Sequence, residues 1–229
     1  MLKGLIFDLD GVIADTARFH LQAWNQLAQR LDIVLPPEAN DALRGRSRMD
    51  SLNLILSYDD KVDAFSDDEK AAFAQSKNDL YLQLIQTLTP ADILPGIAQL
   101  LQDAKSLGLH MSIASASKNA PTILKHLQLD TAFDAIVDPA KLHRGKPDSE
   151  IFELAQQALN LQADEVISFE DASAGVQAIK AANQFAVGIG DAQVLKQADY
   201  IVASTAALNL AAIKKAFDAL KCNIKVRQK

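Results

Sequence analysis

The chain has 229 residues, of which 49% are hydrophobic and 23% charged, and its formal net charge is −6. This composition predicts a globular protein of one or two domains, and an acidic chain without a cluster of basic residues argues against a nucleic-acid partner. The single cysteine, Cys222, excludes an intramolecular disulfide, and no apolar stretch approaches the roughly 20 residues that cross a bilayer. We therefore expect a soluble cytoplasmic protein that does not contact a membrane, with a monomer as the default.

Short apolar runs alternate with helical patterns along most of the chain. The predicted strands cover residues 2–7, 111–114, 135–137, 165–169, 186–189 and 200–202. The predicted helices cover residues 97–107, 120–127, 149–159, 174–182 and 206–220. Alternation of this kind indicates βαβ units, so we expect an α/β fold with a Rossmann-like, mainly parallel sheet.

Residues 16–88 interrupt this alternation because they contain no convincing strand. Apolar residues between Phe19 and Leu31 recur at helical spacing, and Ser66 followed by Glu69 has the pattern of a capping box. A helical insert of about 70 residues is too long for an ordinary loop. We therefore expect an all-helical cap domain at residues 16–88 and an α/β catalytic core at residues 1–15 and 89–229, joined by a hinge.

Two carboxylates, Asp8 and Asp10, directly follow the first predicted strand. Ligands of open α/β sheets bind beyond the carboxyl ends of the strands, where one carboxylate can attack an electrophile while its neighbour moves a proton. Gly11 would permit the turn that aims both side chains at one point. Taken alone, the pair is equally compatible with an ordinary turn at the end of a strand.

Three further groups follow later strands or precede helices. Ser115 begins a run of small polar residues that could bind an anion, and Lys146 offers a positive charge. Glu170 and Asp171 would repel nearby acids unless a hard cation such as Mg²⁺ is present. Taken alone, Ser115 is also explained as a helix cap, Lys146 as a surface lysine, and Glu170 with Asp171 as a solvated acidic pair.

Together these groups predict phosphoryl transfer. Asp8 would attack the phosphorus atom and form an aspartyl-phosphate, while Asp10 would protonate the leaving oxygen and later deprotonate the accepting one. Lys146 and Mg²⁺ would neutralise the phosphoryl charge, and the Ser115 hydroxyl would hold the phosphoryl oxygens. The residues expected to hold the metal are Asp8, Asp10, Glu170 and Asp171.

The ordered set resembles the haloacid dehalogenase superfamily of phosphotransferases, whose pattern is an Asp-x-Asp-Gly loop, a Ser or Thr, a Lys and an acidic pair. In this chain the pattern is Asp8-Leu9-Asp10-Gly11, Ser115, Lys146 and Glu170-Asp171. The insert after the first strand resembles the helical cap of the family's first cap class. The resemblance implies an Mg²⁺-dependent enzyme that acts through an aspartyl-phosphate.

Within the superfamily, several stretches resemble the β-phosphoglucomutase family: residues 7–17, 23–24, 44–48, 50–52, 77–79, 115–119 and 138–140, together with His20. The resemblance implies an enzyme that interconverts β-D-glucose 1-phosphate and glucose 6-phosphate. The intermediate in that family is a bound β-glucose 1,6-bisphosphate, which leaves, turns around and rebinds with its other phosphate at the aspartate. We therefore expect a phosphorylated hexose as the substrate.

The resemblance also gives roles to residues of the cap. A bisphosphate needs a second anion site, and Arg48 is the best candidate because a guanidinium group binds phosphate bidentately. His20 and Lys77 would contact Asp10 and Thr16 when the cap closes. The residues expected to close the distal anion site from the core are Ser117, Lys118 and Asn119. Those expected to shape the sugar cavity are Trp24, Gly45, Arg46, Ser47, Ser51 and Lys77, and the other expected substrate contacts are Leu9, Arg44 and Ala116.

Two other functions are compatible with parts of the pattern. A sugar-phosphate phosphatase of the same superfamily would use Asp8 with water as the acceptor. A protein that only binds a phosphorylated ligand would use the fold without catalysis. Arg48 as a distal phosphate clamp has little purpose in a monophosphatase, and a binding protein needs neither the nucleophile Asp8 nor the proton carrier Asp10.

Overall fold

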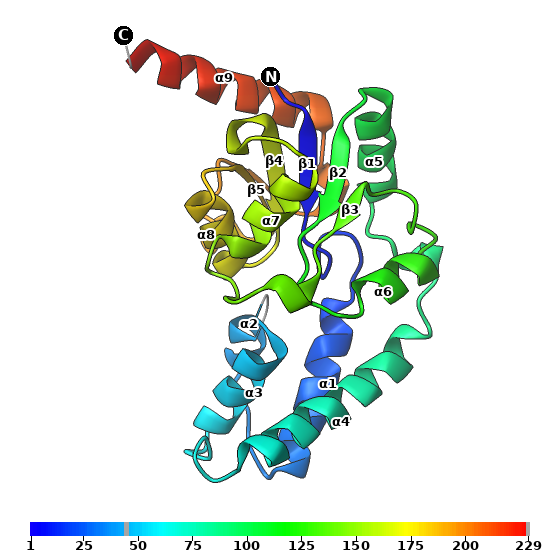
Figure 1. The fold of residues 1–229 in the computed structure, drawn as a ribbon, viewed down its shortest axis with the longest axis vertical. Helices are drawn as coiled ribbons and strands as arrows, with labels where there is room; N and C mark the ends of the chain where they lie inside the picture. Colours follow the sequence, from blue (N-terminus) through cyan, green and yellow to red (C-terminus); the bar gives the residue numbers. More distant parts are fainter. Residues whose placement is uncertain (44–45, 228–229) are drawn as a thin grey trace.

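The structure is a computed structural model and describes residues 1–43 and 46–227. Within the described residues, six strands form one parallel sheet in the order β3-β2-β1-β4-β5-β6 (Figure 1). The strands are β1 (Gly4–Phe7), β2 (His110–Ile113), β3 (Ala135–Ile136), β4 (Val166–Glu170), β5 (Phe185–Ile189) and β6 (Tyr200–Val202). The predicted α/β fold with a Rossmann-like parallel sheet is confirmed.

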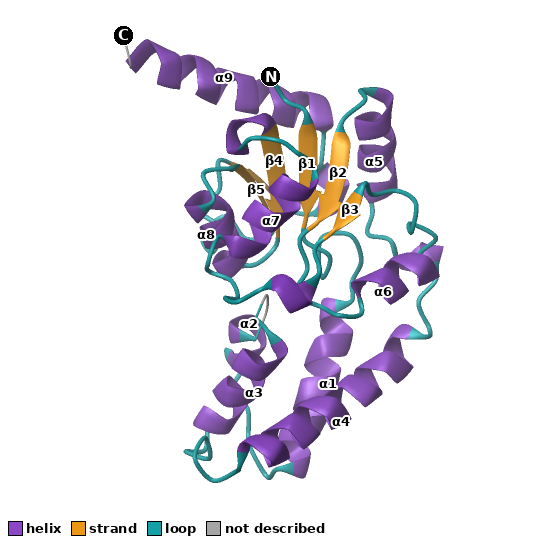
Figure 2. Ribbon diagram, in the orientation of Figure 1, coloured by secondary structure: helices purple, strands orange, loops and turns teal. Residues whose placement is uncertain are grey.

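Helices cover both faces of the sheet (Figure 2). They are α5 (Ile97–Ser106), α6 (Ala120–His126), α7 (Glu150–Ala158), α8 (Ser173–Ala181) and α9 (Leu210–Arg227). In β1, Leu5 and Phe7 lie in one buried cluster with α5, α6 and α9, whereas Ile6 lies in a second cluster with α7 and α8. Near-continuous apolar runs are typical of parallel strands covered on both faces, which explains why these strands could be recognised in the sequence.

Four helices from residues 17–85, here called the helical insert, lie beyond the carboxyl ends of the strands (Figure 1). They are α1 (Ala17–Arg30), α2 (Ala39–Ala42), α3 (Arg48–Ser57) and α4 (Asp67–Ile85). Part of the insert has its own apolar cluster, which includes Trp24 and Ile55. Another part, with Phe19 and Tyr81, belongs to the same buried cluster as Phe7 of β1. The insert is therefore a packed helical unit that is also anchored to the core by apolar contacts.

The two connections between the insert and the core lie side by side. Ala14 forms an isolated antiparallel bridge with Ile93, and the Leu94 amide donates a hydrogen bond to the Ile13 carbonyl at 3.0 Å. The Arg18 guanidinium at the start of α1 pairs with Asp92 in the returning connection at 3.0 Å. Adjacent connections of this kind are what a hinge between the two parts requires.

Most of the predicted strands and helices of the core begin and end within two residues of their predicted bounds, and the differences at β4 and α9 have a visible cause. Glu170 belongs to β4 rather than to the following turn, because its main chain pairs with Gly188 of β5. Helix α9 begins at Leu210 because the Asn209 side chain accepts a hydrogen bond from the Ala212 amide at 2.9 Å, and a 3₁₀ turn precedes it. It also continues to Arg227, beyond the predicted end. No helix in the described part of the chain is long and apolar enough to span a bilayer.

The capping box predicted at the start of α4 is present and offers a test of the insert's stability. The Ser66 hydroxyl accepts a hydrogen bond from the Glu69 amide, and the Glu69 carboxylate accepts one from the Ser66 amide. Because Ser66→Ala removes this cap, we expect the free energy of unfolding to fall by about 1 kcal/mol in urea denaturation. Ser57→Ala, which removes only a hydroxyl bonded to the Leu54 carbonyl in the last turn of α3, is the control. Equal losses for the two variants would contradict the capping role.

Candidate active site

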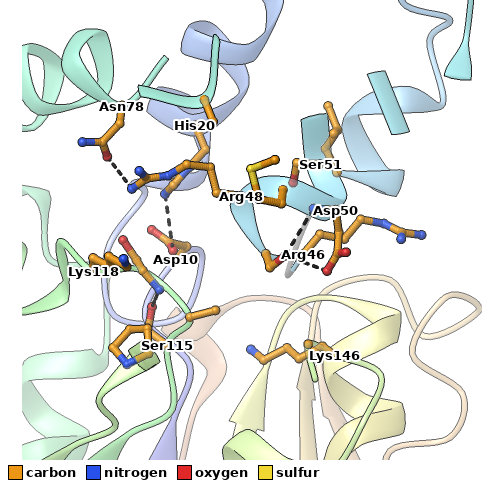
Figure 3. A pocket seen from close by; sticks show the side chains of 18 of the residues that line it. Asp10, His20, Arg46, Arg48, Asp50, Ser51, Asn78, Ser115, Lys118 and Lys146 are labelled. Carbon is orange, nitrogen blue, oxygen red and sulfur yellow. Dashed lines mark hydrogen bonds and ion pairs between the residues drawn. The ribbon is translucent and has the colours of Figure 1, made fainter. Parts of the chain in front are cut away.

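A cavity of about 540 Å³ lies between the strand ends and the helical insert (Figure 3). Its core wall contains Asp8, Asp10, Ser115, Ala116, Ser117, Lys118, Asn119, Lys146 and Asp171. Its insert wall contains His20, Trp24, Arg46, Ser47, Arg48, Ser51 and Lys77. The structure thus brings most of the predicted site residues around one space.

A buried lysine occupies the base of this cavity. The Lys146 Nζ lies 2.6 Å from Asp8 Oδ1 and 2.7 Å from Glu170 Oε2. Burial alone would lower the pKa of Lys146, but the two flanking carboxylates raise it instead, so the ammonium stays charged. Asp8 follows β1 and Glu170 ends β4, and these strands are neighbours in the sheet. The sheet order is therefore what brings the two acids to the same lysine.

Three carboxylates at this base can hold a cation. Oxygen atoms of Asp8, Glu170 and Asp171 lie within 4.8 Å of one another. Burial raises the pKa of Asp8, and burial together with the charge of Asp8 raises the pKa of Glu170 to about 8. A divalent cation would relieve both effects, and an all-oxygen ligand set suits Mg²⁺. The residues present therefore fit the predicted metal.

Two glycines leave room for these carboxylates. Gly11 has φ +86, and a Cβ atom there would lie 2.1 Å from Asp171 Oδ2. A Cβ atom on Gly175 in α8 would lie 2.1 Å from Glu170 Oε2. Gly11 lies in a turn with a positive φ, as predicted, and the nearby Asp171 adds a steric reason for glycine at that position. Asp10 does not join Asp8 in the three-carboxylate cluster, so the aim of both side chains at one point stays a prediction.

Asp10 contacts Thr16 and lies near His20 of the helical insert. Its Oδ1 accepts a short hydrogen bond from the Thr16 hydroxyl, and its Oδ2 lies 3.7 Å from His20 Nε2. Burial raises the pKa of Asp10 although the Thr16 hydrogen bond opposes the shift. A carboxyl group with a raised pKa is suited to carry a proton. The Asp10 side chain is not part of the three-carboxylate cluster, so its predicted role as a metal ligand stays a prediction.

Two residues of the insert extend this contact. The Lys77 Nζ lies 2.7 Å from His20 Nδ1, and it lies over the rings of Trp24 and Tyr81 at 4.7 and 4.8 Å. Burial, with the charges of Lys77 and Arg48, lowers the pKa of His20 well below its usual value, so the ring is neutral. With Nδ1 accepting from the Lys77 amine, the ring proton lies on Nε2, the nitrogen that faces Asp10. The insert therefore reaches the proposed proton carrier, as the sequence predicts.

The distal side of the cavity contains Asn78, which lies in a stretch that resembles the family but for which the sequence predicted no role. The Oδ1 atom of Asn78 accepts hydrogen bonds from Arg48 Nη2 at 2.7 Å and from Asn119 Nδ2 at 3.0 Å. Asn78 is buried on α4 with Ala74, Lys77 and Tyr81, at positions that form one helical stripe. A polar side chain on the helix face that also carries Ala74, Tyr81 and Ile85 was the signal that could have identified Asn78.

The loop before α6 carries the predicted core contacts to the distal anion. The Ser115 hydroxyl accepts a hydrogen bond from the Ser117 amide, and the Ser117 hydroxyl accepts one from the Asn119 amide, both at 3.2 Å. Each hydroxyl still carries a hydrogen that can be donated to an anion. This loop therefore presents donors toward the cavity from the end of β2.

Several residues predicted to contact the substrate have further surroundings that the structure describes, and their substrate contacts stay predictions. The Leu9 side chain packs in the apolar core, so only its main chain could contact a ligand. Thr16 is buried beneath Asp10 and acts on that residue rather than on the cavity. Arg46 lines the cavity, and its Nε also donates a hydrogen bond to the Ala42 carbonyl of α2 at 2.6 Å. Arg44 and Gly45 lie outside the described residues.

The buried Lys77 amine predicts a pH dependence of stability. Burial and the nearby Arg48 charge lower the pKa of Lys77 from 10.5 to about 7 in the folded protein. Between these values the unfolded chain binds the proton and the folded protein does not. The contribution of Lys77 to the free energy of unfolding therefore rises by about 1.4 kcal/mol per pH unit over that range.

We expect Lys77→Met to be more stable than the wild type near pH 7 and to lose this advantage as the pH rises toward 10.5. Urea denaturation at several pH values measures the difference. Lys105→Met on the exposed surface of α5 serves as the control, and its difference from the wild type should stay flat. A constant difference for Lys77→Met would contradict a neutral buried amine.

Comparisons with known proteins agree with this geometry. The family model of haloacid dehalogenase-like hydrolases matches residues 2–183. A β-phosphoglucomutase of Bacillus subtilis (strain 168) is 43% identical over 209 residues, covering 91% of this chain and 92% of the relative. A crystal structure of β-phosphoglucomutase from Clostridium difficile superposes with a TM-score of 0.95 at 43% identity, covering 97% of this chain and 100% of that chain. A fructose-1-phosphate phosphatase of Escherichia coli (strain K12) is 30% identical over 192 residues, covering 81% of this chain and 95% of the relative. The chain therefore belongs to the haloacid dehalogenase-like hydrolase family and is a β-phosphoglucomutase-like member of it.

Proposed function

We propose that this protein is a phosphoglucomutase that interconverts β-D-glucose 1-phosphate and glucose 6-phosphate through β-glucose 1,6-bisphosphate. The observation that carries the proposal is a single cavity with anion-binding groups at two ends. Ser115 and Lys146 lie beside Asp8 at one end, and Arg48 with Asn119 lies at the other. A phosphatase of monophosphates needs only the first end. The relatives named β-phosphoglucomutase at 43% identity support the same activity.

In the proposed reaction, Asp8 is the nucleophile and Asp10 moves the protons. A bond forms between the Asp8 carboxylate and phosphorus while the bond from phosphorus to the sugar oxygen breaks, and Asp10 gives that oxygen its proton. The aspartyl-phosphate then reacts with a hydroxyl of a hexose monophosphate, which gives its proton to Asp10. The Lys146 ammonium, held 2.6 Å from Asp8, offsets the negative charge that gathers around the phosphoryl group.

Enzymes of this family use Mg²⁺, and the acidic cluster provides a site for it. Asp8, Glu170 and Asp171 would hold the ion, with Asp10 as the further predicted ligand. When bound, the ion would neutralise charge on the phosphoryl oxygens and lower their repulsion of the Asp8 carboxylate.

The helical insert would select the acceptor of the phosphoryl group. We take residues 16–88 as a cap domain that closes over the core of residues 1–15 and 89–229. In the described arrangement His20 reaches Asp10 from the insert, and Arg48 is tied to the core loop through Asn78. Closure of this kind excludes water, so that a sugar hydroxyl rather than water receives the phosphoryl group.

One assay tests the proposed reaction against hydrolysis. Purified protein is given Mg²⁺, β-glucose 1-phosphate and a trace of the bisphosphate, and glucose 6-phosphate and inorganic phosphate are measured together. We expect isomerisation well above phosphate release, and no product from Asp8→Asn. Phosphate release alone would replace the mutase with a sugar-phosphate phosphatase, the activity for which the 30% identical relative is named. Neither product would favour a binding protein.

Arg48→Ala separates the distal clamp from the chemistry at Asp8. Because Arg48 lies on the insert and does not touch Asp8 or Lys146, we expect its loss to lower isomerisation at least tenfold through weaker phosphate binding. Hydrolysis of p-nitrophenyl phosphate, which has no second phosphate, should change less than about twofold. Equal losses on both substrates would refute the clamp.

Binding of Mg²⁺ should stabilise the folded protein through the acidic cluster. At a Mg²⁺ concentration one hundred times the dissociation constant, the free energy of unfolding should rise by about 2.7 kcal/mol. We expect Asp171→Asn to lose most of this gain at the same Mg²⁺ concentration, and thermal unfolding measures it. Asp164→Asn, an exposed acid that pairs with Lys221, is the matched control. Retention of the full gain by Asp171→Asn would place the ion elsewhere.

A further inference from the structure

A single side-chain oxygen joins the two sides of the distal anion site. Asn78 is 8% exposed, and its Oδ1 accepts from Arg48 at the start of α3 and from Asn119 in the core loop before α6. Figure 3 shows Asn78 reaching Arg48 above the cavity. Two helices of the insert and one loop of the core therefore meet at one atom.

The two donors are those that a distal phosphate would use. Arg48 and Asn119 converge within hydrogen-bond distance of one acceptor, which is the arrangement that a phosphate oxygen also requires. A guanidinium group has five N–H donors, so Arg48 can keep its bond to Asn78 and offer the remaining donors to an anion. Asn78 also lines the cavity, but its Oδ1 atom already accepts from both donors, so we expect it to act on the phosphate through Arg48 and Asn119.

We propose that Asn78 is a positioning residue that holds Arg48 and Asn119 together as one site for the distal phosphate of a hexose bisphosphate. The inference rests on the proposed function for the identity of the ligand. Without the Asn78 oxygen, the half-buried Arg48 side chain would lose its fixed partner and the insert would lose its link to the core loop. The distal phosphate would then have to order both donors itself, which weakens binding.

A purely structural role predicts a different pattern of effects. If Asn78 only satisfied a buried polar position in α4, its loss would lower stability and reduce every activity by a similar factor. A positioning role predicts weaker binding of the bisphosphate with the chemistry at Asp8 left intact. The two roles are therefore separated by comparing ligand binding, hydrolysis of a small substrate and thermal stability.

The test uses Asn78→Leu, which keeps the approximate size of the side chain and removes the acceptor. Asn53→Leu makes the same change at an exposed position of α3 and is the matched control. Binding of β-glucose 1,6-bisphosphate is measured in the Asp8→Asn background, where no turnover occurs, by fluorescence of Trp24. Trp24 is the only tryptophan in the chain and lines the cavity.

We expect Asn78→Leu to raise the dissociation constant of the bisphosphate about tenfold, equivalent to about 1.4 kcal/mol, and Asn53→Leu to leave it unchanged. With Asp8 intact, hydrolysis of p-nitrophenyl phosphate by Asn78→Leu should stay within about twofold of the wild type. In an Arg48→Ala background, Asn78→Leu should weaken binding by clearly less than tenfold, because one of the two donors that Asn78 holds is already gone. If Asn78→Leu does not fold, Asn78→Ser takes its place. The serine side chain is too short for its oxygen to reach Arg48, so we expect the same pattern.

Three results would overturn the inference: unchanged bisphosphate binding, equal loss of binding and hydrolysis, or the full tenfold effect in the Arg48→Ala background. These results are independent of the mutase assay. If the wild type isomerises the sugar and Asn78→Leu binds the bisphosphate normally, only the role of Asn78 is refuted. If the wild type only hydrolyses the sugar phosphate and Asn78→Leu binds the bisphosphate tenfold more weakly, only the mutase activity is refuted.

Discussion

The ion pairs of the buried Lys146 ammonium with Asp8 and Glu170 are the interaction on which the rest of the site depends. Each of these charges would be very unfavourable in isolation at this depth, and together they are tolerated because the contacts are 2.6 and 2.7 Å long. The pairing fixes the ends of β1 and β4 relative to the loop before α7. It also leaves an excess of negative charge, since one ammonium faces two carboxylates and Asp171 lies beside them. The base of the cavity is therefore prepared for a cation.

The insert supplies the opposite charge on the other side of the cavity. Arg48 and Lys77 share one wall, and burial together with the charge of Arg48 lowers the pKa of Lys77 to about 7. That wall contains few negative charges of its own, so an anionic ligand is the natural partner for Arg48. A substrate with phosphate at both ends can meet the cation and Lys146 at the base while its second phosphate meets Arg48. The separation of charge across the cavity supports the proposed bisphosphate better than any single residue does.

The core could be predicted from the sequence further than the insert could. Asp8 and Glu170 end neighbouring parallel strands, and parallel strands present their carboxyl ends at one edge, so local patterns were enough to bring these acids together. The predicted strand ended one residue before Glu170. An acidic residue is unusual in a buried strand, and only the contact with Lys146, distant in sequence, explains why Glu170 is buried there. Asn78 could not be assigned because its role depends on Asn119, 41 residues away in another part of the fold. No local pattern in the sequence marks the contacts between the insert and the core.

The contacts of the insert with the core are joined to one another within the insert. His20 lies in the first turn of α1, close to the paired connections at Ala14 and Ile93, and its neighbour Asp10 belongs to the core. The Lys77 amine lies 2.7 Å from His20, and the next residue of α4, Asn78, accepts hydrogen bonds from Arg48 and from Asn119 of the core. A rotation of the insert about its connections would therefore act on the contact from His20 to Asp10 and on the link from Asn78 to Asn119 together. The group that carries the proton and the distal anion site are thus set by the same arrangement of the insert.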